Sequence, residues 1–187
     1  MNIVIIGSGG REHALCYKLL KSSKINKIYC IPGNAGTDEI ATNIFADIND
    51  FDEIYKIVLK LNVELIVVGP EIPLVNGIVD YFEKKNIKIF GPNKKCSQLE
   101  GSKFFMKNIC KKYNIPSAKY FEISDINQIE KFLSSVSFPV VVKSDGLAAG
   151  KGVTICNNLD EVIKDVQEIL DGKFKSSNKV FIEEFLE

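Results

Sequence analysis

The stretch of sequence that decides the fold lies at residues 140–153 and reads VVVKSDGLAAGKGV. An apolar run ends in Lys143, a glycine- and alanine-rich turn follows, and a second apolar run begins at Val153. Apolar β-branched runs on both sides of such a turn predict two strands joined as a hairpin. The turn has few side chains, and its glycines accept positive φ angles, so its backbone N–H groups can converge on an anion. Two interpretations remain open from this pattern alone: a loop that covers a phosphate, or an ordinary turn with solvated lysines.

The composition is that of a globular protein without a strong charge bias. The chain has 187 residues, of which 45% are hydrophobic, enough for one large domain or two small ones. Lys+Arg and Asp+Glu both number 24, which predicts no bulk attraction to nucleic acid or to a membrane surface. The 5 cysteines are widely spaced without a C-x-x-C pair, so we expect free thiols in a reducing compartment. The short apolar run at the amino terminus does not resemble a signal peptide, and we expect a soluble cytoplasmic protein.

Short apolar runs alternate with helical patterns over the first 90 residues. This order predicts an α/β domain, a parallel sheet with helices on both faces, whose ligand crevice lies at the carboxyl ends of the strands. The expected strands are residues 2–6, 25–31, 44–45, 65–68 and 87–90, and the expected helices begin near residue 14 and span residues 51–61 and 74–85.

The loop after the first strand begins like a dinucleotide-binding fingerprint but does not continue as one. Gly7 and Gly9 fit the pattern, whereas the third glycine is replaced by Glu12, and no acidic residue ends the second strand. A nicotinamide cofactor is therefore not expected. Backbone N–H groups at a helix start still suit a single phosphate, with Arg11 either assisting or simply solvated. We expect His13, the only histidine, to be structural.

Two further loops follow strand ends. Residues 32–37 consist of turn formers. Glu71 stands between Pro70 and Pro73, and we expect it in an extended, rigid loop. Its carboxylate could bind sugar hydroxyls or could be an ordinary surface charge, and the pattern leaves both open.

The sequence pattern changes after Phe90, and we expect a domain boundary between Gly91 and Gly101. The remainder predicts a small α+β unit of hairpins backed by helices. Its expected helices are residues 101–113, 126–133 and 159–170, and its expected strands are residues 120–123, those of the hairpin and residues 180–186.

These motifs, read together, resemble one family. The hairpin with Lys143, followed by a predicted strand ending in EEFL at residues 183–186, is similar to the ATP-grasp superfamily. Further motifs narrow the resemblance to the phosphoribosylamine–glycine ligase family of purine synthesis, over nearly the whole chain. They are GGREH at residues 9–13, NAGT at 34–37, GPEIPL at 69–74, GP at 91–92 and LEGSK at 99–103.

The resemblance implies a role for each motif. Two lysines would contact the ATP phosphates, the glycine-rich turn would be a flap over them, and the last strand would read the adenine edge. The implied ATP-binding residues are Lys103, Lys143, Asp145, Gly146, Leu147, Ala148, Ala149, Gly150, Lys151, Gly152, Glu183, Glu184, Phe185 and Leu186. The implied phosphoribosylamine-binding residues are Gly9, Gly10, Arg11, Glu12, Asn34, Ala35, Gly36 and Glu71.

The implied domains are an amino-terminal α/β domain at residues 1–100, a linker helix region at 101–118 and a small ATP-grasp subdomain at 119–187. The implied reaction joins glycine to 5-phosphoribosylamine through a glycyl phosphate and consumes ATP with Mg²⁺. Because the family is longer than this chain, we expect an amino-terminal portion that is inactive alone, with the metal ligands and the glycine site beyond Glu187. We assign no catalytic or metal-binding residue here, and we expect small-molecule partners and a monomer. The alternative is a non-catalytic module that binds a nucleotide or phosphosugar.

Overall fold

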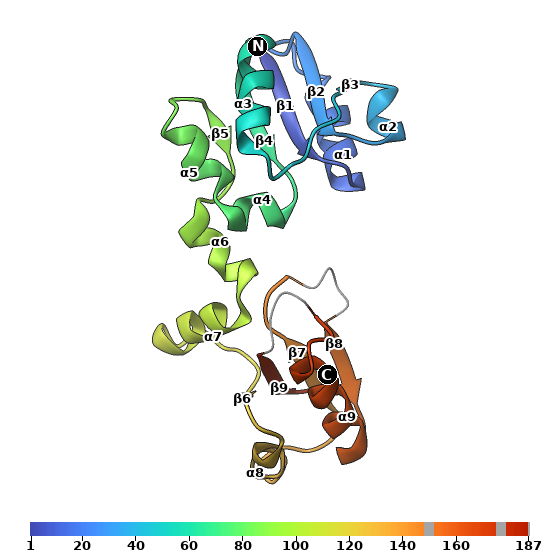
Figure 1. Cartoon of the computed structure of the whole chain (residues 1–187), viewed down its shortest axis with the longest axis vertical. Helices are drawn as coiled ribbons and strands as arrows, with labels where there is room; N and C mark the ends of the chain where they lie inside the picture. Colours follow the sequence, from blue (N-terminus) through green and yellow to red (C-terminus); the bar gives the residue numbers. More distant parts are fainter. Residues whose placement is uncertain (148–151, 175–178, 187) are drawn as a thin grey trace. The chain divides into compact units, whose positions relative to one another are not determined.

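The computed structural model describes residues 1–147, 152–174 and 179–186. The chain divides into two compact units, Met1–Gln98 and Leu99–Glu187, and each is described by itself. Figure 1 shows an α/β arrangement in the first and a sheet with helices in the second. The predicted fold class is confirmed.

The first unit is built on a 5-stranded parallel sheet with the order β3-β2-β1-β4-β5. The central strand β1 (Asn2–Gly7) pairs with β2 (Lys27–Pro32) on one side and β4 (Val63–Val68) on the other. The edges are β3 (Thr42–Asn43) and β5 (Ile89–Phe90). Alternate residues of the strands face opposite sides, so the sheet presents two apolar faces.

Helices cover both faces of this sheet. Ile3 and Ile5 pack with Cys16 of α1 (Gly10–Leu19) on one face. Val4 and Ile6 pack on the other with α3 (Phe51–Lys60), where Ile54 and Val58 are spaced to share one side of the helix, and with α5 (Ile78–Glu83). Figure 1 shows α1 and α3 on opposite sides of the strands. The two cores hold the strand ends, and therefore the loops after them, in fixed positions.

Several expected elements of the first unit differ in the structure. One predicted helix at 74–85 is two helices, α4 (Glu71–Asn76) and α5, because Gly77 adopts φ +97° between them. Glu71 is therefore the first residue of α4 and not part of an extended loop. The expected strand at 44–45 is wrong: β3 pairs through Thr42 and Asn43 with β2, and Phe45 is exposed.

Two short helices were also not predicted. The turn-forming loop contains α2 (Ala35–Asp38), which begins because the Asn34 side chain accepts a hydrogen bond from Thr37 N. A further helix, α6 (Lys94–Gly101), precedes the expected one. The helix expected at 101–113 is α7 (Lys103–Lys112), which starts after Ser102 in extended conformation.

The second unit has a 4-stranded antiparallel sheet with the order β6-β9-β7-β8. One face packs against α9 and α8 through Val140, Val142 and Ile182. The other face meets α7, where the rings of Phe104 and Phe181 lie 4.0 Å apart. The elements in order are β6 (Tyr120–Ile123), the 3₁₀ helix η1 (Ile126–Gln128), α8 (Ile129–Leu133), β7 (Val140–Ser144), β8 (Val153–Cys156), α9 (Leu159–Leu170) and β9 (Val180–Glu184).

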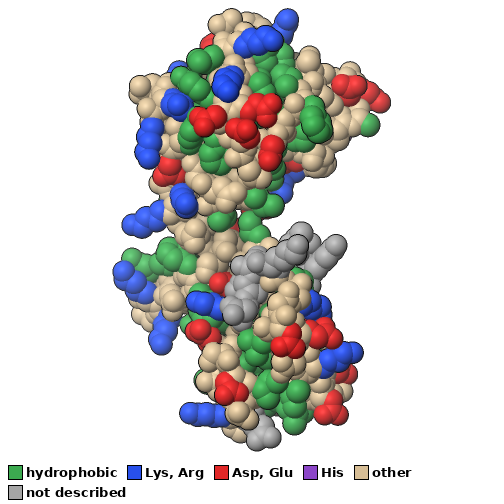
Figure 2. Space-filling model, in the orientation of Figure 1, with side chains coloured by type: hydrophobic (Ala, Val, Ile, Leu, Met, Phe, Trp, Pro, Cys, Tyr) green, Lys and Arg blue, Asp and Glu red, His purple; other side chains and the backbone are tan. Residues whose placement is uncertain are grey.

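The predicted hairpin is β7 paired with β8, and the predicted helix at 159–170 is confirmed. The expected last strand ends at Glu184, two residues earlier than expected. On the face shown in Figure 2, basic and acidic side chains are interspersed, in keeping with the equal numbers of the two charges in the sequence.

Candidate functional site

A lysine and a glutamate from neighbouring strands form the centre of the site in the second unit. Lys143 Nζ donates a hydrogen bond to Glu183 Oε2 at 2.8 Å. β7 and β9 pair in a register that sets Lys143 opposite Phe181, so both side chains of the ion pair stand on the α7 side of the sheet. The Glu183 side chain is 5% exposed and that of Lys143 26%, so the lysine still reaches solvent.

Lys107 of α7 joins this pair, and sequence reasoning did not find it. Its Nζ lies 3.4 Å from Glu183 Oε1, so one carboxylate faces two ammonium groups. The lysine is 3% exposed. Lys103 and Lys107 are four residues apart and share a helix face, which was the available signal.

Asp145 and Lys103 connect the start of the glycine-rich turn to the start of α7. Asp145 Oδ1 accepts hydrogen bonds from the backbone N–H groups of Lys103 at 2.7 Å and Phe104 at 3.4 Å. Lys103 Nζ donates to the Gly146 carbonyl at 3.0 Å. Burial lowers the pKa of the Lys103 ammonium below its usual value, with Lys143 acting in the same direction and Asp145 opposing it. The carboxylate thus occupies a helix start, where backbone N–H groups favour negative charge.

An apolar strip lies beside Lys143 on the same face. Val141 pairs with Ile155, and Lys143 with Val153, in the antiparallel register of β7 and β8. Val153 is 49% exposed and Ile155 52%. The strip was not predicted, although Val141 stands two residues before Lys143, the spacing that puts two strand residues on one face.

Glu184 is the last residue of β9, and Phe185 and Leu186 follow it outside the strand. Glu184 Oε1 accepts from Lys119 N at 2.8 Å, and Glu184 N donates to the Lys119 carbonyl at 3.0 Å. Phe185 is 39% exposed and Leu186 65%. In the turn, Leu147 is half-buried, and the buried Gly152 accepts from Ser144 N at 3.0 Å. The predicted site residues Ala148, Ala149, Gly150 and Lys151 lie outside the described residues.

The Glu12 side chain contacts two of the strand ends in the first unit. Its side chain is buried, and its Oε2 accepts a hydrogen bond from Gly9 N at 2.6 Å. A Cβ atom at Gly69 would lie 1.9 Å from Oε1, and one at Gly7 2.7 Å from Cδ. Gly7 at the end of β1 and Gly69 after β4 therefore make room for this carboxylate, and Glu12 holds the two strand ends together.

Arg11 and Glu71 form an exposed ion pair across the same strand ends. Nη1 and Nη2 of Arg11 both donate to Glu71 Oε1 at 3.1 Å. The pKa of the Glu71 carboxyl lies below its usual value, first because of the hydrogen bond from its own backbone N–H and then because of Arg11. An exposed pair of this kind contributes little to stability, so its groups can exchange partners at little cost.

Asn34 fixes the third loop. Its Nδ2 donates to the carbonyls of Ser8 at 2.8 Å and Gly9 at 3.3 Å, which joins the loop after β2 to the loop after β1. Ala35 and Gly36 open α2, and a Cβ at Gly36 would lie 2.6 Å from Cε1 of His13. His13 therefore packs against α2, in agreement with the expected structural role.

The structure therefore brings the predicted residues together in two groups. In the second unit, Lys103 contacts Asp145 and Gly146, and Lys143 contacts Glu183. Gly9, Gly10, Arg11, Glu12, Asn34 and Glu71 lie in the linked loops and first helical turns that follow β1, β2 and β4 in the first unit. Within the described ranges, no group of three or more His, Cys, Asp or Glu side chains could hold a metal ion. None of the helices in those ranges has the length and apolar character to cross a membrane.

Comparison with known proteins covers the whole chain. Residues 1–100 match the family described as phosphoribosylglycinamide synthetase, N domain, and residues 101–187 match its ATP-grasp (A) domain. The chain belongs to the phosphoribosylglycinamide synthetase family. The resemblance stated from the sequence is thereby confirmed.

Curated relatives of this family are considerably longer. Phosphoribosylamine–glycine ligase of Clostridium acetobutylicum is 44% identical over 100% of this chain, which covers 45% of that protein. The Pseudomonas aeruginosa ligase of the same name is 42% identical, with 44% of its length covered. The chain therefore spans less than half the length of the curated relatives it matches.

Solved structures of related proteins are similar to this chain as well. The crystal structure of phosphoribosylamine–glycine ligase from Thermotoga maritima matches 100% of this chain and 44% of its own length, with a TM-score of 0.77 and 32% identity. The biotin carboxylase domain of Hydrogenobacter thermophilus 2-oxoglutarate carboxylase, solved with MgADP, has a TM-score of 0.78 at 18% identity over 44% of its length. The second likeness shows a shared fold.

Proposed function

We propose that the sheet face carrying Lys143 binds ATP, within a protein that ligates glycine to 5-phosphoribosylamine in purine biosynthesis. The supporting observation is the position of a partly exposed lysine beside an apolar strip. ATP needs a cation for its phosphates and an apolar surface for its base, and Lys143 with Val141, Val153 and Ile155 offers both side by side. Family membership supports the same assignment.

The proposal gives the residues of the second unit distinct tasks. Lys103 and Lys143 neutralise phosphate charge, the turn residues cover the phosphates, and the backbone after β9 reads the adenine edge. Asp145 positions the turn against α7, because its carboxylate is already engaged there. The proposed ATP-binding residues remain Lys103, Lys143, Asp145, Gly146, Leu147, Ala148, Ala149, Gly150, Lys151, Gly152, Glu183, Glu184, Phe185 and Leu186.

For the first unit we propose phosphoribosylamine binding at the loops after β1, β2 and β4. Backbone N–H groups at the start of α1 suit the phosphate, and the exposed Arg11 and Glu71 suit the phosphate and sugar hydroxyls. The proposed residues are Gly9, Gly10, Arg11, Asn34, Ala35, Gly36 and Glu71, with Glu12 shaping the loops from beneath.

The chemistry explains why such groups suffice. A glycine carboxylate is a poor electrophile, so ATP first transfers its γ-phosphate to it and leaves as ADP. The amine of phosphoribosylamine then attacks the acyl phosphate, which forms the amide and releases inorganic phosphate. Phosphoryl transfer requires mainly positioning and charge neutralisation, and a closed loop keeps water from the acyl phosphate. Mg²⁺ supplies further charge neutralisation when bound. From the family resemblance, the proposal assigns its ligands to the part of the longer relatives that this chain does not cover.

The alternative is a module that binds a nucleotide or phosphosugar without catalysis. The proposal also includes a monomeric protein and a reducing cytoplasm, and the 5 free cysteines support the reducing compartment. Glycine-dependent ADP release separates the two functions. We expect this ADP release from a protein of the relatives' length and not from residues 1–187 alone. If the longer protein released no ADP on addition of glycine, the non-catalytic module would be favoured.

Calorimetric titration tests the nucleotide site directly. We expect ATP to bind residues 1–187 more tightly than inorganic tripolyphosphate, because the apolar strip receives the base. Lys143→Met should weaken ATP binding about tenfold or more, the loss of one charge-assisted hydrogen bond. Lys111→Met, which removes an exposed lysine of the same helix as Lys103, is the matched control. Equal affinity of the Lys143→Met variant and the unaltered chain would contradict the proposal.

A further inference from the structure

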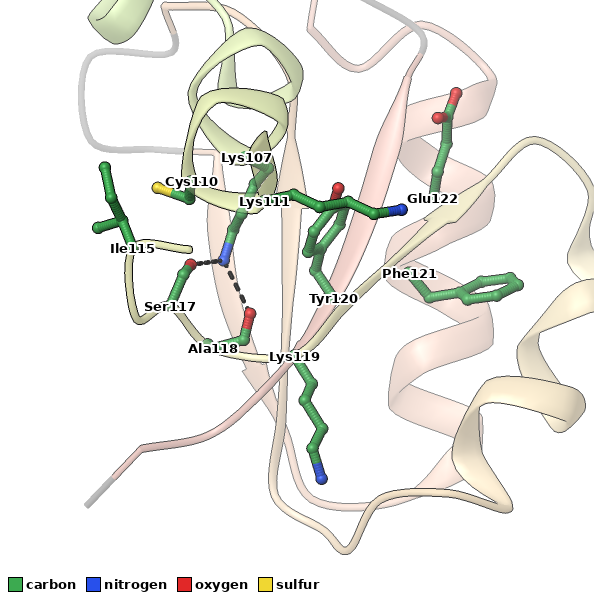
Figure 3. A pocket seen from close by; sticks show the side chains of 10 residues that line it. All are labelled: Lys107, Cys110, Lys111, Ile115, Ser117, Ala118, Lys119, Tyr120, Phe121 and Glu122. Carbon is green, nitrogen blue, oxygen red and sulfur yellow. Dashed lines mark hydrogen bonds between the residues drawn. The ribbon is translucent and has the colours of Figure 1, made fainter. Parts of the chain in front are cut away.

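The ammonium group of Lys107 is buried and has three oxygen atoms near it. Its Nζ donates to Ser117 Oγ at 2.7 Å and the Ala118 carbonyl at 3.1 Å, and lies 3.4 Å from Glu183 Oε1. Figure 3 shows the first two contacts, with Lys107 reaching from α7 toward the segment before β6. An ammonium group has three donors, of which these hydrogen bonds use two, and the Glu183 carboxylate is its ion-pair partner.

Attachment of α7 to the segment before β6 does not by itself explain why a charged side chain is buried here. Lys107 is 3% exposed, and a buried ammonium costs several kcal/mol of desolvation. Lys111 lines the same cavity, of about 510 Å³, and remains exposed. Lys107 differs from its neighbour in its three oxygen partners, Ser117 Oγ, the Ala118 carbonyl and Glu183 Oε1, and of these only Glu183 carries a charge.

The charges of Lys107, Lys143 and Glu183 do not cancel. Oε1 faces Lys107 and Oε2 faces Lys143, so the group carries two positive charges and one negative, a net charge of +1. Without Lys107, Glu183 and Lys143 would form a neutral pair. A phosphate approaching Lys143 would then compete with a carboxylate that has no other cation.

We propose that Lys107 is a positioning residue for Lys143: by sharing the Glu183 carboxylate, it keeps the group positively charged and leaves Lys143 able to bind a phosphate. The proposal rests on the proposed function, since the phosphate is that of ATP. It assigns the Glu183 side chain the task of holding two lysines, so Glu183 contributes only its backbone to the proposed ATP site.

Charge-balanced variants test this. Lys107→Met makes the group neutral, whereas Lys107→Met with Glu183→Gln restores the net charge of +1. Lys107→Arg keeps the charge, and Lys111→Met is the matched control on the same helix. Where Lys107→Met alone fails to fold by circular dichroism, the double variant and Lys107→Arg carry the comparison.

Two readouts separate this proposal from the proposed function. The first is acylation of Lys143 by limiting acetic anhydride, followed by peptide mass spectrometry, which needs no nucleotide. Lys107→Met should lower Lys143 labelling about fivefold, because Glu183 then holds that ammonium alone, and the double variant should return it toward the unaltered value. The second readout, the Kd for ATP, should rise about fivefold in Lys107→Met and recover in the double variant.

A purely structural role predicts another pattern. It would leave the double variant as impaired as Lys107→Met in both readouts, and this result would overturn the proposal. Lys143 labelling that is unchanged in Lys107→Met would overturn it as well. Absence of ATP binding with the predicted labelling pattern would contradict the proposed function and leave the positioning role standing.

Discussion

Oε1 of Glu12 occupies the space that a side chain at Gly69 would need: a Cβ there would lie 1.9 Å from it. Gly69 follows β4 and Glu12 lies in the first turn of α1, so this close approach joins two of the loops at the carboxyl edge of the sheet. The loop after β1 is joined by the hydrogen bond from Gly9 N to the same carboxylate. One buried side chain therefore determines the shape of the proposed phosphosugar site.

Gly69→Ala should destabilise the first unit. The new methyl group must displace Glu12 and the loop, and forced overpacking of this kind costs about 1–3 kcal/mol. Urea unfolding followed by circular dichroism measures the change. Gly10→Ala is the matched control, because a Cβ there meets nothing within 4 Å and alanine suits a helix better than glycine. Equal stability of the two variants would show that the Glu12 contact is not as close as described.

Asp145→Ala should destabilise the second unit by about 1 kcal/mol, within the range for loss of a helix-capping side chain. The reason is that Asp145 accepts hydrogen bonds from Lys103 N and Phe104 N at the start of α7. Asp145→Asn keeps an acceptor oxygen and should retain most of the stability in urea unfolding. If both variants matched the unaltered chain, Asp145 would not stabilise the start of α7.

The buried thiols should be unreactive in the folded protein. Burial raises the pKa of Cys30 to about 12 and that of Cys156 to about 11, so both remain protonated thiols at pH 8, while the thiolate is the nucleophile. The pKa of Cys16 is also raised, again mainly by burial. Cys96 is exposed.

Iodoacetamide at pH 8 should therefore label Cys96 at least about tenfold faster than Cys30, as measured by peptide mass spectrometry. In concentrated urea the cysteines should react at similar rates, which is the control. Rapid labelling of Cys30 under native conditions would mean that β2 is not buried as described.

The alternation of apolar runs and helical patterns was enough to predict the parallel sheet, α1, α3 and the hairpin of β7 and β8, because these depend on local periodicity. The break at Gly77 was not predictable, because a single glycine is tolerated inside a helix. The helix ends there because Gly77 adopts a φ of +97°, which the sequence does not show. The strand order β3-β2-β1-β4-β5 depends on pairing between distant segments.

Charged residues were the harder part of the site. Lys107 and Glu12 stand in helices, where charged residues are usually solvated. Lys107 is buried because Glu183, from a distant segment, meets it, and Glu12 is buried where the distant Gly69 leaves room for its carboxylate. Sequence spacing carries no information about such partners. The apolar strip of Val141, Val153 and Ile155 depended likewise on the register between β7 and β8.

The central claim is that the sheet face carrying Lys143 binds ATP. Amide NMR of the ¹⁵N-labelled chain during titration with ATP tests this claim most directly. We expect the largest shift changes at Val141, Lys143, Val153 and Ile155 and in the residues after β9. The amides of β1 and β4 should change little. Changes confined to residues 1–98, or none on β7 and β8 at saturating ATP, would contradict the account.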